Sequence, residues 1–291
     1  MRRTVAVLTG LCLIVVAAGC ERGQPSSTPS ASSERPAPGD HQLTLKHNGL
    51  DRGYLLHAPP GYDPSRAPAL VIALHFYPGS GYLVRDLAGL EARGDRDNVL
   101  VAYPDGLDGG YNALSCCGNA DDVGFLNALT DHLVQTWRAD PNRVFLTGIS
   151  NGGDMSFRAA VEATGRYAAI GVVSGGYSGA LTTDESYVPK SPVSVITFIG
   201  AQDEYAPKFQ AGIKTWQQRL RCTPASKASG VPRVTRTEAR CADGSEVSVY
   251  TIADMGHSWP GATSGQLAAP AAGVTATDLI WDFFASHPRR A

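Results

Sequence analysis

The sequence lacks a strong charge of either sign, because its 291 residues carry a formal net charge of only −2. This balance favours neither nucleic acid nor an anionic membrane surface as a partner. Metal-binding Cys and His spacing, such as C-x-x-C followed by H-x-x-x-H, is also missing, and so is any internal repeat. With 43% apolar and 18% charged residues, the composition is typical of a globular protein, and we expect no metal or other cofactor.

The N-terminal apolar run, Val5 to Ala18, is too short for a comfortable transmembrane helix. Because two arginines precede it and small residues end it, residues 1–19 are predicted to be a signal peptide. The small residues before Cys20 resemble the lipobox of bacterial lipoproteins, although Ala17 stands where Leu is usual. We therefore expect Cys20 to be lipidated. The alternative is an ordinary signal peptide cut nearby.

Residues 20–40 are rich in Ser and Pro and predict a flexible tether, because such a segment cannot bury enough apolar surface to fold. The expected protein is exported and held at the cell membrane through its lipid anchor only, or else secreted. The folded part, residues 41–291, is expected to form one catalytic domain.

Apolar runs of strand length alternate with helical patterns along this domain. Buried strands are predicted at 69–74, 99–103, 143–147, 169–173, 193–199 and 247–252, after an opening pair at 43–45 and 53–58. Helices are predicted at 122–137, after Ser150, at 208–220 and at 277–285. This alternation predicts an α/β fold with a mostly parallel central sheet and helices on both faces, whose chemistry lies in loops at the carboxyl ends of the strands.

The sequence G-x-S-x-G at positions 148–152 is a weak signal by itself, but a predicted strand enters it and a predicted helix leaves it. A strand, a sharp turn and a helix form the nucleophile elbow of α/β hydrolases. Side chains at Gly148 or Gly152 would collide with the neighbouring strand and helix. Ser150 is therefore the candidate nucleophile.

A serine hydroxyl needs a base to take its proton. In this fold the chain order is Ser, then acid, then His, and only His257 and His287 follow Ser150. His257 follows a predicted strand and lies among Gly and Pro residues, whereas His287 lies in the polar tail. We therefore expect His257 to be the base.

The acid must hold the imidazole in the correct tautomer. Asp203 lies just past the strand predicted at 193–199. Glu204 is its main rival, and Asp184 and Asp254 are weaker candidates.

An oxyanion hole needs two backbone N–H donors. One is expected from Asn151, the residue after the nucleophile. The other is expected from Phe76 or Tyr77, which follow the strand predicted at 69–74. His75, at the end of that strand, is expected to brace the loop.

These residues stand in motifs that resemble the poly(3-hydroxybutyrate) depolymerase and feruloyl esterase family of secreted bacterial esterases, which have the α/β-hydrolase fold. The matching motifs are Tyr103-Pro104-Asp105-Gly106, Cys116-Cys117-Gly118, Asp121-Asp122-Val123-Gly124-Phe125, Ser150-Asn151-Gly152-Gly153 and Gly256-His257-Ser258-Trp259-Pro260-Gly261. The resemblance implies a serine carboxylic ester hydrolase with the same three catalytic residues. Two positions depart from the family: Phe76 replaces a usual Gly, and Asp154 replaces a usual Met and is expected to face solvent.

Four cysteines, Cys116, Cys117, Cys222 and Cys241, remain in the domain, and export favours disulfides. A bond between adjacent cysteines is disfavoured, because their Cα atoms lie closer than is usual for a disulfide. A bridge from Cys222 to Cys241 would close the polar insertion 223–240. The alternative is that all four are reduced.

Four aromatic residues near the predicted chemistry, Phe76, Tyr77, Tyr205 and Trp259, predict a ring-lined pocket for small esters, with Trp259 and Tyr205 as substrate-binding candidates. The expected substrates are small or oligomeric esters of feruloyl, acetyl-sugar or hydroxybutyrate type. The alternatives are a serine peptidase, which usually carries a further large domain, and a catalytically inactive binding lipoprotein, which would have lost a member of the triad.

Overall fold

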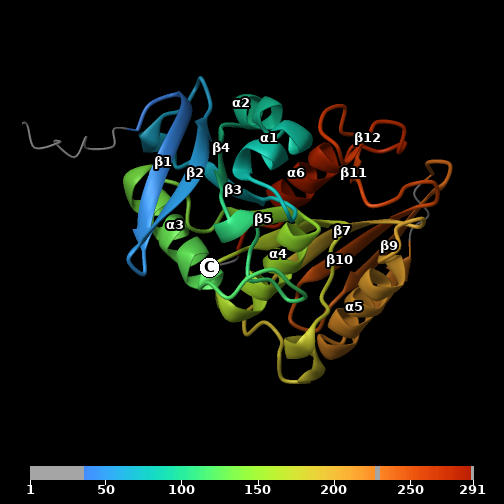
Figure 1. Ribbon diagram of the computed structural model, residues 1–291. Helices are drawn as coiled ribbons and strands as arrows, with labels where there is room; N and C mark the ends of the chain where they lie inside the picture. Colours follow the sequence, from blue (N-terminus) through green and yellow to red (C-terminus); the bar gives the residue numbers. More distant parts are fainter. Residues whose placement is uncertain (1–35, 227–229, 290–291) are drawn as a thin grey trace, which may run out of the picture. The chain divides into compact units, whose positions relative to one another are not determined.

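A ten-stranded β-sheet organises residues 36–226 and 230–289, the parts of the chain that this computed structural model describes (Figure 1). Its strand order is β1-β2-β4-β3-β5-β6-β7-β10-β9-β8. The strands are β1 (Gly39–His47), β2 (Leu50–Ala58), β3 (Ala69–Leu74), β4 (Val99–Pro104), β5 (Val144–Ile149), β6 (Ala169–Val173), β7 (Ser194–Gly200), β8 (Thr223–Ser226), β9 (Val234–Arg240) and β10 (Glu246–Ile252). The signal peptide, Cys20 and most of the tether lie outside the described residues.

The centre of the sheet is parallel and its two edges are antiparallel. Neighbours among β4, β3, β5, β6, β7 and β10 run parallel, whereas β1–β2, β2–β4, β10–β9 and β9–β8 are antiparallel pairs. The predicted α/β-hydrolase fold is confirmed. Strand β1 begins at Gly39, two residues before the start expected for the domain.

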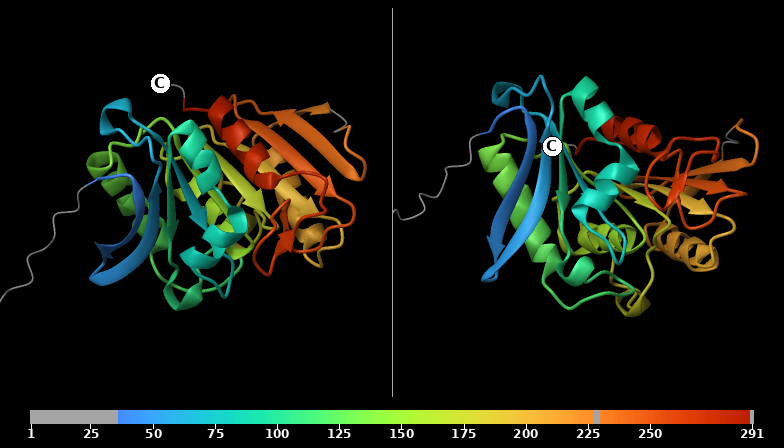
Figure 2. Two further views of the ribbon diagram at one scale, coloured as in Figure 1. Left: turned by 90° about the horizontal axis from the view of Figure 1, so that it is seen from above. Right: turned by 45° about the horizontal axis from the view of Figure 1, so that its top comes forward.

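Helices cover both faces of the sheet (Figure 2). They are α1 (Gly81–Ala88), α2 (Glu91–Asp97), α3 (Asp122–Thr136), α4 (Asn151–Glu162), α5 (Ala206–Arg219) and α6 (Ala276–Ser286). Alternate residues of β3 belong to two apolar clusters: Leu70, Ile72 and Leu74 pack with α3, α4 and α5, whereas Ala69, Val71 and Ala73 pack with α1 and α6. This strand is buried on both faces, which explains its unbroken apolar sequence.

One edge of the sheet differs from the expectation. Residues 223–240, interpreted from their polarity as an insertion, contain the antiparallel strands β8 and β9. Cys222 is disulfide-bonded to Cys241 across this segment, the pairing that the sequence favoured.

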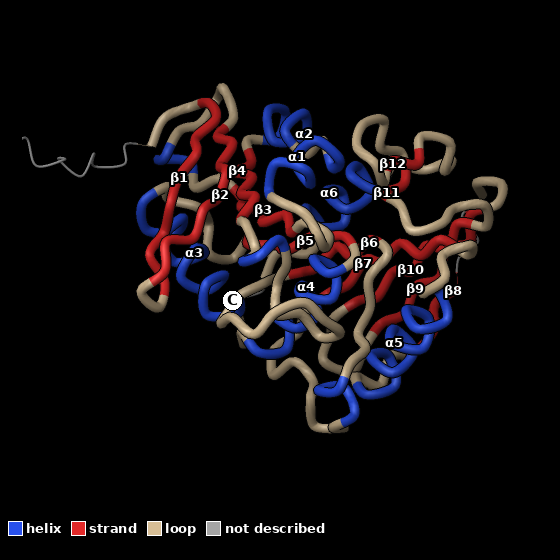
Figure 3. Tube along the Cα trace, viewed as in Figure 1, coloured by secondary structure: helices blue, strands red, loops and turns tan. Residues whose placement is uncertain are grey.

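The carboxyl ends of the parallel strands all lie on the same side of the domain. Loops leave β3, β6, β7 and β10 there (tan in Figure 3), and β5 turns into α4 at Ser150. A two-stranded sheet of β11 (Trp259–Pro260) and β12 (Ala268–Ala269) follows the loop after β10. Within the described ranges, no helix is long and apolar enough to cross a membrane.

Candidate active site

Ser150 lies in a strained turn between β5 and α4. Its backbone has φ 57° and ψ −120°, outside the regions that side-chain-bearing residues prefer. A Cβ atom on Gly148 would lie 2.5 Å from the carbonyl carbon of Gly152, and one on Gly152 would lie 2.3 Å from the oxygen of Leu74. Only glycine fits at these two positions. The turn therefore holds the half-buried Ser150 at the carboxyl end of β5.

His257 and Asp203 form a hydrogen-bonded pair. The Nδ1–H of His257 donates to Oδ2 of Asp203 at 2.7 Å, and the other carboxylate oxygen accepts the N–H of Tyr205 at 2.9 Å. The Asp203 side chain is fully buried and that of His257 is 26% exposed. Because an ionised carboxylate only accepts, the ring proton lies on Nδ1, and Nε2 is free to accept a proton.

Tight packing fixes the two loops that carry this pair. The N–H of Gln202 donates to the oxygen of Met255 at 3.0 Å. A Cβ on Gly200 would lie 2.3 Å from the carbonyl oxygens of both Met255 and Gly256. The loops after β7 and β10 therefore approach closely only because residue 200 is glycine.

The rival acids and the second histidine lie elsewhere. Glu204 is exposed. Asp184 accepts the N–H of Ser186, and Asp254 pairs with a surface arginine. His287 lies just past α6 and contacts a glutamate of β10. Among these candidates only Asp203 bonds to His257.

The end of β6 connects Ser150 to the loop of His257. The N–H of Ser150 donates to the oxygen of Val173 at 3.0 Å, and the hydroxyl of Ser174 donates to the oxygen of Ser258 at 3.3 Å. Within the described residues, the hydroxyl of Ser150 makes no hydrogen bond to His257, a contact that often tightens only when substrate is bound.

The loop after β3 is braced by His75, as expected. Its Nδ1–H donates to the oxygen of Phe76 at 2.7 Å, and its Nε2 accepts the N–H of Gly106 at 2.9 Å. Burial lowers the pKa of His75, so the ring is neutral and can make both bonds. The same ring packs against Tyr111, with ring centroids 4.6 Å apart.

Of the four aromatic residues expected to line the pocket, two are buried and two are exposed. Trp259 is fully buried, and its ring N–H donates to the hydroxyl of Thr277 in α6, so its prediction as a substrate-binding residue is wrong. The ring of Phe76 is also buried, in the same apolar cluster. Tyr77 and Tyr205 are 52% and 48% exposed, and the ring of Tyr205 lies 5.8 Å from that of His257.

Asp154 does not face solvent, and this prediction is corrected. Its side chain lies on the first turn of α4, where it accepts the hydroxyl proton of Ser115 and, at 2.7 Å, the N–H of Gly176. The residue is 4% exposed, and burial raises the pKa of its carboxyl group. No sequence pattern marked this burial, because Ser115 and Gly176 are distant from Asp154 in sequence.

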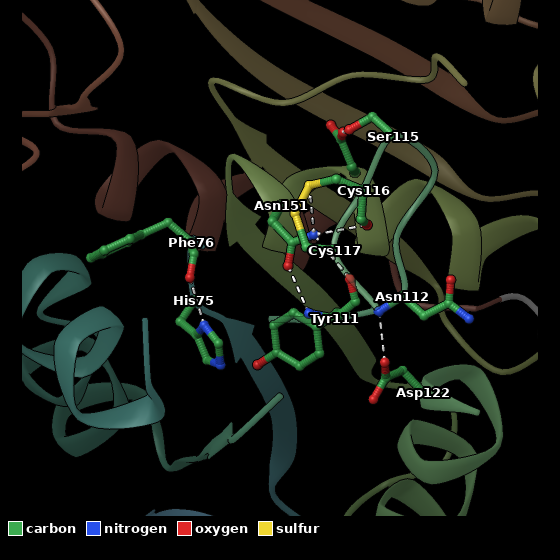
Figure 4. The surroundings of a disulfide bond; sticks show 10 residues. His75, Phe76, Tyr111, Asn112, Ser115, Cys116, Cys117, Asp122 and Asn151 are labelled. Carbon is green, nitrogen blue, oxygen red and sulfur yellow. Dashed lines mark hydrogen bonds between the residues drawn. A yellow bond between two sulfur atoms is a disulfide. The ribbon is translucent and has the colours of Figure 1, made fainter. Parts of the chain in front are cut away.

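Cys116 and Cys117 are bonded to each other, contrary to the expectation from their spacing (Figure 4). The backbone takes an unusual path here, with φ 143° at Cys117 and φ 148° at Gly118. The side-chain amide of Asn151, the residue after the nucleophile, donates to the oxygen of Cys116 at 3.3 Å. A turn that is distant in sequence therefore borders the nucleophile.

An acid–histidine pair and a serine at the turn after β5, on a sheet of this order, define an α/β hydrolase. Feruloyl esterase C of Emericella nidulans is 29% identical, with 85% of this chain and 90% of the relative covered. No protein-family model matches the sequence.

Solved structures agree on the fold. An acetyl xylan esterase from Aspergillus awamori has a TM-score of 0.60 at 17% identity, covering 75% of this chain and 94% of the other. A thermophilic esterase from Thermogutta terrifontis has a TM-score of 0.61 at 12% identity, covering 86% and 94%. The chain is a serine carboxylic ester hydrolase of the α/β-hydrolase fold, and its curated relatives include proteins named feruloyl esterase C.

Proposed function

We propose that the protein hydrolyses small or oligomeric carboxylic esters through an acyl-enzyme on Ser150, with His257 as base and Asp203 as the acid that orients it. The observation that carries this assignment is the 2.7 Å hydrogen bond from His257 to buried Asp203. The pair lies at the carboxyl ends of the parallel strands, where the strained turn also holds Ser150. His257 takes the hydroxyl proton as Ser150 attacks the ester carbonyl, and then gives it to the leaving alcohol. A water molecule activated by His257 releases the acid.

The developing oxyanion would be stabilised by the backbone N–H of Asn151 and that of Phe76 or Tyr77. Asn151 is the first residue of α4, so its N–H has no partner within the helix. In the described part of the chain, the N–H groups of Phe76 and Tyr77 likewise donate to no acceptor. His75 holds the loop that carries them.

The substrate is proposed to be an ester of feruloyl, acetyl-sugar or hydroxybutyrate type. Exposed Tyr205, beside His257, supports a substrate with a ring. Residues 177–189 contain only one short 3-10 helix, Ala180–Thr183, rather than a long amphipathic lid of the kind expected over a site for lipid chains. The relatives named for feruloyl and acetyl xylan esters support the same classes.

We also propose that the enzyme is exported and anchored by a lipid on Cys20. The two disulfides within the described residues support an oxidising compartment, where such bonds persist.

The test is hydrolysis of p-nitrophenyl acetate by Ser150→Ala and His257→Ala, with His287→Ala as the matched histidine control. Each catalytic substitution should lower kcat by at least about a thousandfold, and combining them should add little, because the two residues act as a unit. The control should retain full activity. If Ser150→Ala kept a tenth of the activity, the assignment would be wrong. A peptide nitroanilide cleaved faster than the ester would favour the peptidase alternative.

A further inference from the structure

The disulfide of Cys116 and Cys117 lies at the surface, directly beside the nucleophile turn. Cys116 is exposed and Cys117 is half-buried. The side-chain nitrogen of Asn151, the residue that follows Ser150 in the chain, lies 3.7 Å from the sulfur of Cys116. Figure 4 shows Asn151 beside the disulfide. The catalytic steps proposed above do not use the disulfide.

Helix α4 holds the disulfide turn by two side chains. The oxygen of the Asn151 amide accepts the N–H of Tyr111 at 2.8 Å, and its nitrogen donates to the oxygen of Tyr111 at 3.0 Å. One turn further along α4, buried Asp154 accepts the hydroxyl proton of Ser115. Asn151 is 3% exposed, and both polar atoms of its amide bond to the loop, so this side chain fixes the loop rather than contacting substrate.

Helix α3 holds the same loop at Asn112, the residue that directly follows Tyr111. The N–H of Asn112 donates to Oδ2 of Asp122 at 2.7 Å, and Oδ1 accepts from the guanidinium of Arg52 at 2.6 Å. The side chains of Arg52 and Asp122 are only 2% and 1% exposed. A surface held from both sides is preorganised relative to Ser150, as a binding site requires.

The ring of Tyr77 lies near the disulfide, and together they form a larger apolar surface. A Cβ on Gly110 would lie 2.6 Å from Cδ2 of Tyr77 and 3.2 Å from Cβ of Cys117, so the ring and the disulfide approach each other over a glycine. The ring of Tyr77 remains half exposed. Tyr77 also belongs to the loop that is expected to supply an oxyanion donor.

We infer that the surface formed by Tyr77, Cys116 and Cys117 binds a planar aromatic ring of the ester substrate. Polarisable sulfur and an aromatic face both favour contact with a ring. Apart from the hydroxyl of Tyr77, the three side chains offer no strong hydrogen-bonding group, which a sugar would need. The inference rests on the proposed ester hydrolysis at Ser150 and names its substrate class.

The experiment compares kcat/KM for matched esters with and without a ring. Methyl benzoate and methyl butyrate differ on the acyl side, and benzyl acetate and butyl acetate differ on the alcohol side. Two variants remove parts of the surface, Tyr77→Leu and the double variant Cys116→Ser/Cys117→Ser. Leu50→Ala removes an equally exposed side chain of β2 that is not part of the surface, and it serves as the control. Thermal unfolding verifies that each variant is folded.

Both surface variants should lower the ratio of aryl to alkyl kcat/KM about two- to tenfold, because one ring contact contributes about that factor. The two variants should lower it for the same pair of esters, either the acyl-side pair or the alcohol-side pair. The control should leave both ratios unchanged. Equal losses for the aryl and alkyl members would overturn the inference, and so would a selective loss for an acetylated xyloside. Tyr77→Leu decides the question if the cysteine variant does not fold. Activity that survives Ser150→Ala would instead refute the proposed function itself.

Discussion

Replacing Asp203 with asparagine would test which carboxylate supports His257. The two side chains are joined by a 2.7 Å bond, at which distance two unit charges attract by about 6 kcal/mol in a medium of effective dielectric constant about 20. His257 is partly exposed, so screening leaves about 3–5 kcal/mol for the imidazolium that forms as Ser150 attacks. This energy corresponds to a loss in kcat of about a hundred- to several thousandfold.

The hydrogen-bonding chemistry of asparagine also predicts a loss in kcat. Its amide could donate to Nδ1 of His257, which would move the ring proton to Nε2 and prevent that atom from accepting the proton of Ser150. The assay is kcat on p-nitrophenyl acetate, with thermal unfolding measured alongside because Asp203 is buried. Glu204→Gln, at the exposed neighbouring position, is the control and should change kcat less than about twofold. A larger loss for Glu204→Gln than for Asp203→Asn would refute the reasoning.

Two further predictions concern buried charges near the site. Arg52→Met should lower the free energy of unfolding in urea by about 3–5 kcal/mol, because it leaves Asp122 ionised and buried without its cation. Adding Asp122→Asn should restore about half of that loss or more, and a double variant no more stable than Arg52→Met would contradict the explanation. The raised pKa of Asp154 means that the folded state holds this proton more tightly than the unfolded state, so the stability due to this group falls as pH rises above its ordinary value of 3.8. Asp154→Asn should therefore lose less stability than the wild type between about pH 4 and pH 7 in urea unfolding, and parallel profiles would refute this.

The centre of the fold could be predicted from the sequence because its strands are buried on both faces. Strands β3 and β6 have the predicted bounds, since each is an unbroken run of buried residues. Strand β9 could not be found in this way. Its residues alternate between buried and exposed and are mostly polar, so no apolar run marks it.

Some features of the candidate site could also be predicted from the sequence, and others could not. Ser150, Asp203 and His257 could be proposed because each follows a recognisable strand in the order that the fold requires. The burial of Trp259 and of Asp154 could not be predicted, because it depends on segments distant in sequence, α6 for the first and Ser115 for the second. The disulfide of Cys116 and Cys117 was rejected because adjacent Cα atoms lie closer than in most disulfides, yet the two residues are bonded with their Cα atoms 3.5 Å apart.

The pairing of β7 with β10 has a consequence for how the enzyme gains activity during folding. These neighbours are parallel, and the chain between them includes α5, β8 and β9. Pairs so distant in sequence form slowly, because the entropy of closing the long intervening loop is lost before any contact compensates for it. Asp203 and His257 follow these two strands and meet only once the pair has formed. A refolding chain should therefore regain secondary structure before it can hydrolyse an ester, and a nascent chain still lacking β10 is inert.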